Sequence, residues 1–239
     1  SLITGPLIET AILSRVTLRL VFPLFAPFGI AAAAISFFIK FPEERSQRVS
    51  LNVYKNPGFR VAIYNNTAYS IPFAFIVVFA GIYARSHFNV SYAVATGLYS
   101  LFYTTSFISR LFLSVKAIEG IERITAFSIA LTAIGLLMAT LSNSVLIFMI
   151  SMLILGVPHG LTYPVSLISI SRSFRDEERN VANSQFYAFM TMVSIAVMPL
   201  TGLLAQAVGL KNVFALLVPV VLLLFALMKR DMNYLPLKG

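Results

Sequence analysis

Long apolar segments dominate this sequence and determine its fold class. Seven of them approach the roughly 20 residues that an α-helix needs to cross about 30 Å of hydrocarbon: Leu20–Ile39, Val61–Ala84, Ser91–Val115, Ile124–Leu141, Val145–Ile170, Val181–Ala207 and Asn212–Met228. Only 11% of the residues are charged, against roughly 25% in soluble domains, so polar groups could not cover a water-facing surface. The sequence therefore predicts an all-α, polytopic transmembrane helix bundle embedded in a lipid bilayer.

An eighth apolar piece, Ser1–Leu13, is too short for a complete span. It begins without Met and without a cluster of basic residues, so it does not resemble a signal peptide. We expect it to be the end of a truncated helix in a longer protein. A short re-entrant or interfacial segment is the alternative.

The basic residues predict the orientation of the chain. If the first piece starts on the cytoplasmic side, 14 of the 18 Lys and Arg residues fall in cytoplasmic segments and 4 fall outside. Basic residues concentrate in the cytoplasmic loops of membrane proteins, so this orientation and a cytoplasmic C-terminus are favoured. The net charge of +9 then reflects loops that face anionic lipid, because the basic residues do not form the single basic face of a nucleic-acid-binding protein.

Composition argues against several kinds of chemistry. The chain has no Cys, which removes thiolate nucleophiles, zinc–thiolate sites and iron–sulfur clusters. Its two histidines, His87 and His159, are too few for the paired axial ligands of a membrane cytochrome. No Lys lies in the middle of an apolar segment, where a retinal Schiff base would need it. We therefore expect no metal, no cofactor and no enzymatic activity.

Several short motifs, in order along the chain, resemble the major facilitator superfamily of twelve-helix transporters. The opening Thr4-Gly5-Pro6-Leu7 resembles the Gly-Pro element late in helix 5 of that family, although Ile8, Glu9 and Thr10 replace the small residues that usually follow. Arg15–Lys40 resembles the loop before helix 6 and that helix itself. The segment from Ser109-Arg110-Leu111 to Glu119-Gly120-Ile121-Glu122-Arg123 resembles the loop between helices 8 and 9.

Further matches follow in the last third of the chain. Gly156, Gly160 and Pro164 have the small-x3-small-x3-Pro spacing of helix 10. The segment Arg175-Asp-Glu-Glu-Arg179 resembles the loop into helix 11, and Met198-Pro199-Leu200-Thr201-Gly202 resembles a Gly-Pro segment within it. Each motif alone is weak, because small-xxx-small patterns recur in membrane helices. In the family the loop between helices 8 and 9 acts as a charged latch between helix ends. The resemblance implies a gating or loop role for Gly5, Pro6, Arg110, Glu119, Arg123, Gly156, Gly160, Pro164, Arg175 and Arg179.

The resemblance also implies a division of the chain. Residues 1–41 would be the end of helix 5 and helix 6 of an N-terminal half, 42–58 the central cytoplasmic loop, and 59–239 the C-terminal six-helix half. About seven spans would be complete and one truncated. The polar stretch Pro42–Gly58 supports the position of the loop, because its charges, Ser and Pro are typical of linkers.

Polar side chains within the apolar segments are the candidate substrate-binding residues. Such groups are costly in hydrocarbon and usually face a bundle interior or water; interhelical hydrogen bonding is the alternative role. In the family, helices 7, 8, 10 and 11 line the central cavity, which implies substrate-binding roles for Asn65, Asn66, Tyr69, Tyr99, Tyr103, His159, Tyr163 and Thr191. No carboxylate lies in the middle of a complete span, so proton coupling would depend on His159 or on the missing N-terminal helices, or would be absent.

The expected function is transport of a small-molecule substrate by alternating access in the plasma membrane, without covalent chemistry. The alternative is a non-transporting scaffold subunit of a larger membrane complex, built on a partial transporter fold, because half of such a bundle cannot enclose a substrate alone. The expected partners are accordingly the lipid bilayer, the substrate, and either the missing N-terminal helices or another membrane subunit. No nucleic acid is expected.

Overall fold

The apolar segments form helices in the computed structural model, which describes residues 4–39, 52–115 and 120–233. Each predicted segment overlaps one helix, although Leu20–Ile39 runs past the end of α2 at Ser36, and most helices extend beyond the apolar run into polar residues. The elements are α1 (Thr4–Leu13), α2 (Leu18–Ser36), the 3₁₀ turn η1 (Val53–Lys55), α3 (Pro57–Phe88), α4 (Tyr92–Val115), α5 (Ile121–Leu141), α6 (Val145–Ser173), α7 (Asp176–Val208) and α8 (Leu210–Met232). The described residues contain no strand.

Local sequence signals explain where several helices begin. Asn56 precedes α3, and its Oδ1 accepts hydrogen bonds from the backbone N–H groups of Gly58 at 2.8 Å and Phe59 at 3.3 Å. Pro57 occupies the first turn of α3, where no N–H is needed. Ser144 caps α6 by accepting from the N–H of Ile147. These caps satisfy backbone donors that a helix start leaves unpaired.

Five of the described helices, α3, α5, α6, α7 and α8, are long and apolar enough to cross a membrane. The 24-residue α4 has sufficient length for a span, but its Tyr, Ser and Thr residues make it less apolar than these five. In α2 the apolar stretch is shorter, Phe25–Ser36. The chain is a multi-pass integral membrane protein.

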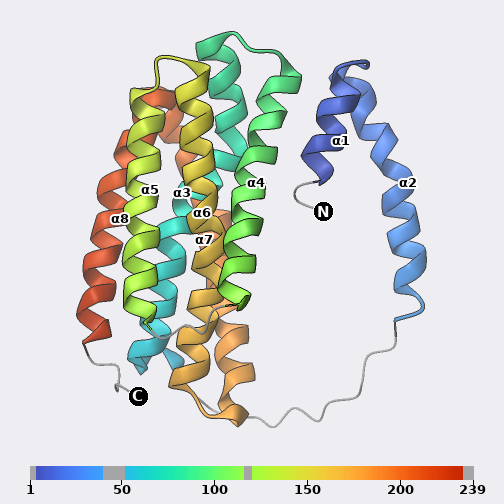
Figure 1. The fold of residues 1–239 in the computed structure, drawn as a ribbon. Helices are drawn as coiled ribbons and strands as arrows, with labels where there is room; N and C mark the ends of the chain where they lie inside the picture. Colours follow the sequence, from blue (N-terminus) through green and yellow to red (C-terminus); the bar gives the residue numbers. More distant parts are fainter. Residues whose placement is uncertain (1–3, 40–51, 116–119, 234–239) are drawn as a thin grey trace.

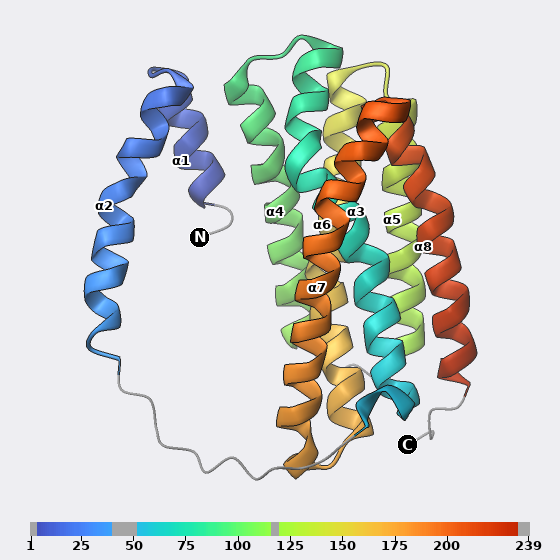
Figure 2. The same cartoon turned by 180° about the vertical axis from the view of Figure 1, so that it is seen from behind.

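Helices α3 to α8 pack side by side in one bundle, α1 lies beside α4, and α2 contacts α1 on the side away from the bundle (Figures 1 and 2). The closest packing joins α4 to α6, where Gly156 and Gly160 allow the helices to approach. A Cβ on Gly156 would overlap the carbonyl oxygen of Phe102, and a Cβ on Gly160 would overlap that of Ser106. The small-xxx-small spacing therefore serves packing between α4 and α6 in this structure.

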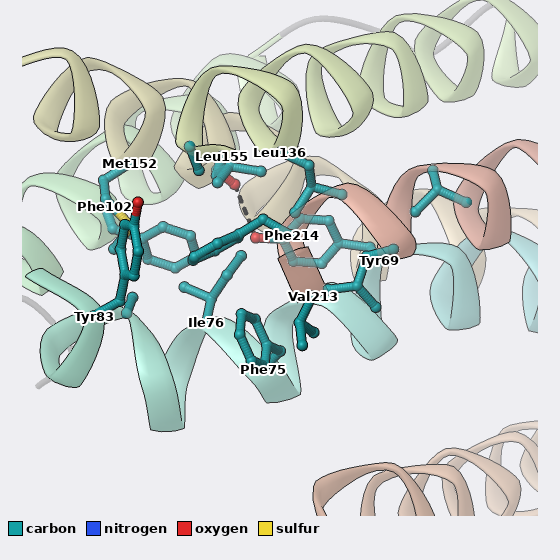
Figure 3. Packing of buried hydrophobic residues seen from close by; sticks show 14 of the residues in the cluster. Tyr69, Phe75, Ile76, Tyr83, Phe102, Leu136, Met152, Leu155, Val213 and Phe214 are labelled. Atoms are coloured by element: carbon teal, nitrogen blue, oxygen red, sulfur yellow. Dashed lines mark hydrogen bonds between the residues drawn. The ribbon is translucent and has the colours of Figure 1, made fainter. Parts of the chain in front are cut away.

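The main core is rich in aromatic residues contributed by α3, α4, α6 and α8 (Figure 3). Phe214 of α8 packs edge-on against Phe75 at 4.9 Å and against Tyr83 at 5.4 Å between ring centroids. Phe148 of α6 contacts Tyr83 at 5.2 Å. Such tilted and edge-to-face pairs contribute roughly 0.5–1.5 kcal/mol each beyond burial of their area. The aromatic core therefore joins α3, α4, α6 and α8.

One ion pair fastens an end of the bundle. The carboxylate of Asp231, near the end of α8, is 2% exposed and accepts a 2.7 Å hydrogen bond from Nε of Arg60 in the first turn of α3. Arg60 also donates through Nη1 to the carbonyls of Tyr54 and Lys55 in η1. The buried Val53 anchors the same turn against α3, α6 and α7. The start of α3, the end of α8 and the turn before α3 are therefore tied together.

Candidate functional site

A cavity of about 400 Å³ opens between α3, α6 and α7, with one residue contributed by α4. Most of its lining is polar or aromatic, which is unusual for surfaces within membrane-spanning helices. We call it the polar cavity; its lining consists of Asn66, Tyr69, Ser70, Phe73, Ala74, Arg110, His159, Thr162, Tyr163, Tyr187, Met190, Thr191, Ser194 and Met198. Helix α7 shows the least burial of the five candidate spans.

Helical spacing explains why these residues meet. Asn66, Tyr69, Ser70 and Phe73 recur every three or four residues, so they form one stripe along α3. Tyr187, Thr191, Ser194 and Met198 recur at the same intervals and form a facing stripe on α7. Helix α6 contributes His159, Thr162 and Tyr163 to the same cavity. The cavity is thus a surface built from three helix faces.

His159 is held firmly at the wall of the cavity. Its Nδ1 lies 2.7 Å from the hydroxyl oxygen of Ser106 on α4. The imidazole contacts four aromatic rings, with centroid distances from 4.5 Å to 5.8 Å, those of Tyr69, Phe73, Phe102 and Tyr103. These contacts fix the plane of the ring, so its nitrogens have defined directions.

Five of the eight predicted substrate-binding residues line the polar cavity: Asn66, Tyr69, His159, Tyr163 and Thr191. Tyr163 is 43% exposed. Asn66 is buried, and its Nδ2 donates to the hydroxyl of Ser70. The hydroxyl of Tyr69 donates to the carbonyl of Leu155 at 2.8 Å, so it also joins α3 to α6 (Figure 3). Tyr69 therefore has a structural bond as well as a place at the wall.

The side chain of Asn65 points instead into the contact between α3 and α6. It is 3% exposed, and its Nδ2 donates to the carbonyl of Thr162 at 3.0 Å and to the hydroxyl of Ser166 at 2.9 Å. Ser166 also donates to the carbonyl of Ala62 on α3. Buried polar groups of this kind are stabilising when paired, and Asn65 is paired within the bundle. Its geometry is that of an interhelical hydrogen bond.

Tyr99 lies in a different place from the other candidates. Its hydroxyl accepts from the N–H of Gly81 at 3.0 Å, and it lines a second cavity, of about 410 Å³, between α3 and α4. That cavity also contains Arg85, whose guanidinium carbon lies 3.3 Å from the centre of the Tyr92 ring. Tyr103 does not line the polar cavity, but its ring contacts His159 from behind at 5.6 Å.

The predicted loop-motif residues are spread along the chain. Gly5 and Pro6 lie in α1, Pro164 lies in α6, and Arg123 is exposed in the first turn of α5. Arg175 and Arg179 adjoin the start of α7, where the Arg175 N–H donates to Glu178 and Arg179 forms a 2.6 Å ion pair with Asp176. That pair is exposed, so it adds little stability. Glu119 lies outside the described residues.

Sequence reasoning missed part of the lining. Four apolar residues of the lining have side chains that do not by themselves indicate a binding site: Phe73, Ala74, Met190 and Met198. Each continues a polar stripe at helical spacing, and that spacing could have found them. Arg110 was assigned to a loop motif, yet it lines the cavity from α4. Among the described residues, no group of three or more His, Cys, Asp or Glu side chains could hold a metal ion.

A multi-pass helical membrane protein with a polar cavity between its spans is the class that this fold and site define. The chain belongs to the Major Facilitator Superfamily, whose family model matches residues 67–233. It is also 31% identical, over 98 residues, to the Escherichia coli (strain K12) protein called "Putative transporter AraJ". That alignment covers 41% of this chain and 25% of the relative, so it spans about a quarter of that protein's length. Both findings support a transporter-type function.

Proposed function

We propose that the protein transports a small solute by alternating access and that the polar cavity is the part of the solute pathway contributed by α3, α4, α6 and α7. The observation that carries this proposal is the convergence of two polar stripes and His159 on one cavity within membrane-spanning helices. Polar side chains at membrane depth usually mark a substrate or ion pathway. In transporters of this kind, solute sites lie near the bilayer midplane between two packed repeats.

In this proposal α1 and α2 are the end of an N-terminal half, residues 42–58 are the linker, and α3 to α8 are the C-terminal half. We place the linker and the C-terminus in the cytoplasm, and the protein in the plasma membrane, because of the distribution of basic residues. The contact between α1 and α4 is compatible with two halves that pack against each other. The kinks that rocking requires would come from prolines within the spans, such as Pro72, Pro158 and Pro199.

A solute screen followed by one matched pair of variants tests the proposal. Sugars, organic acids, amino acids and hydrophobic cations are first screened for stabilisation of the intact protein against heat, because a ligand that binds only the folded state raises the unfolding midpoint. The stabilising solute is then measured for uptake into proteoliposomes.

We expect Asn66→Ala to lower kcat/KM for uptake by about tenfold, since a lost polar contact of about 1.4 kcal/mol corresponds to that factor. Tyr99→Phe is the matched control, because it removes a hydroxyl that lies in the other cavity. If uptake is unchanged in Asn66→Ala but lost in Tyr99→Phe, the solute pathway lies in the second cavity and not in the polar cavity. Solute binding and uptake that are undetectable in the intact protein would favour the scaffold role.

A further inference from the structure

We propose that the polar cavity selects a small organic anion, a solute with a carboxylate or phosphate group, and that Arg110 binds this group directly. This inference rests on the proposed function and adds the class of substrate. Arg110 is the one residue with a permanent charge in the cavity lining described above. An anionic solute would place its charged end against this guanidinium.

The acidic residues of the described chain lie elsewhere. Asp231 binds Arg60, Asp176 binds Arg179, and the carboxylate of Glu178 accepts from the N–H of Arg175. The other described carboxylates belong to α1, to the first turn of α5 and to the first turn of α7, and they are Glu9, Glu122 and Glu177. None of these six lines the polar cavity. The cavity is therefore positively charged, which opposes binding of a cation.

Arg110 has no ion-pair partner among the described residues. Arg110 is exposed, so a solute in the cavity can reach it, and within a membrane protein a counter-charge with good geometry stabilises such a group. Guanidinium is suited to this task because its planar donors match carboxylate and phosphate oxygens in pairs. An anionic solute would supply the counter-charge that the described residues do not provide.

The uncharged lining is also rich in hydrogen-bond donors. Tyr163 and Tyr187 present phenolic hydroxyls that no bond in the described structure occupies, and both residues are exposed. When the Ser106 hydroxyl donates to Nδ1 of His159, the neutral imidazole carries its proton on Nε2 and offers a further donor. Donors of this kind favour a solute whose polar end consists of acceptor oxygens.

The remaining wall is apolar and suits the rest of such a solute. Phe73 and Ala74 from α3 and Met190 and Met198 from α7 line the same cavity. Met side chains adapt to different shapes and pack well against rings. The combination predicts an anion with a hydrocarbon or aromatic part.

Matched pairs of anionic and neutral compounds test this inference on the intact protein. The pairs are benzoate and benzamide, phenyl phosphate and phenol, and lactate and lactamide, and binding is read from the unfolding midpoint across a concentration series. We expect at least one anion to bind ten or more times more tightly than its neutral partner. Arg110→Gln should abolish that preference, and Arg110→Lys should keep part of it. Lys211→Gln is the control, because Lys211 is exposed on α8 and does not line the cavity.

Three results would overturn the inference. In the first, neutral compounds bind as tightly as the matching anions, and they bind Asn66→Ala more weakly than the wild-type protein. This result would leave the proposed function intact and remove the anion preference. In the second, Arg110→Gln slows uptake of every solute equally and leaves solute binding unchanged. Arg110 would then act in gating and not in binding. If no anion or neutral compound, in this set or in the wider solute screen, shifts the midpoint, both the inference and the proposed function fail.

Discussion

Gly156→Ala is expected to destabilise the protein by about 1–2 kcal/mol, although the same change stabilises most helices. Alanine has a helix propensity roughly 1 kcal/mol more favourable than glycine. At Gly156, however, the added Cβ overlaps the carbonyl oxygen of Phe102 and the hydroxyl of Thr105, so α4 and α6 must separate. Overpacking of this kind typically costs about 1–3 kcal/mol. The steric cost should exceed the gain in propensity.

Gly97→Ala is the matched control for this prediction. Gly97 also lies within a helix, α4, but no atom lies within 4 Å of the position that its Cβ would occupy. We therefore expect Gly97→Ala to leave the unfolding midpoint unchanged or to raise it, while Gly156→Ala lowers it. The comparison is made by thermal unfolding in detergent, with the monodisperse fraction as a second measure. Equal midpoints for the two variants would contradict the close α4–α6 contact.

His159→Phe is expected to lower uptake by tenfold or more with little effect on folding. Phenylalanine preserves an aromatic ring among Tyr69, Phe73, Phe102 and Tyr103, so packing of the cluster is largely kept. It removes both ring nitrogens, and with them the hydrogen-bonding groups of this side chain at the cavity wall. The hydroxyl of Ser106 can then bond to a carbonyl of its own helix, as Ser109 and Thr104 do in α4.

The measurement is kcat/KM for uptake, alongside the unfolding midpoint of the same preparation. Ser106→Ala serves as the companion variant, because it removes the partner of Nδ1 but leaves the imidazole in place. We expect a smaller loss of uptake in Ser106→Ala than in His159→Phe. Wild-type uptake in His159→Phe would exclude the imidazole from the solute pathway.

The helices and the family were predictable from sequence because both depend on patterns along one chain. Apolar segments give the helices directly, since a span needs a fixed length of apolar residues. The short segments Ile124–Leu141 and Asn212–Met228 needed flanking residues to complete their spans, and α5 and α8 include such residues. The helix ends were predicted less closely, because capping groups such as Asn56 extend α3 beyond the apolar run.

The candidate site was predictable only in part, because residue type does not show which way a helix face points. Asn65 and Asn66 are neighbours, yet Asn65 bonds to α6 and Asn66 lines the cavity. Successive residues on a helix point about 100° apart, so only the packing partners separate the two roles. Tyr99 shows the same limit, since its place in the second cavity follows from the contact between α3 and α4. The sequence motif predicted a loop role for Arg110. That Arg110 lines the cavity follows only from how α4 packs in the bundle.

Cysteine accessibility tests the central claim, that the polar cavity is a water-filled solute pathway, most directly. The 239 residues contain no native Cys, so a thiol introduced here is the only one in this part of the protein. Ser70→Cys and Ser194→Cys would place thiols on opposite walls of the cavity. Leu223→Cys would place one on α8, where Leu223 is 61% exposed and does not line the cavity. Thiols react as thiolates, which form readily in water and poorly in hydrocarbon.

Each variant of the intact protein is treated in vesicles with a charged methanethiosulfonate reagent, with and without the solute found by the screen. The account predicts rapid labelling at positions 70 and 194, protection by that solute at both, and little labelling at position 223. Slow labelling at both cavity positions, or labelling that the solute leaves unchanged, would contradict it.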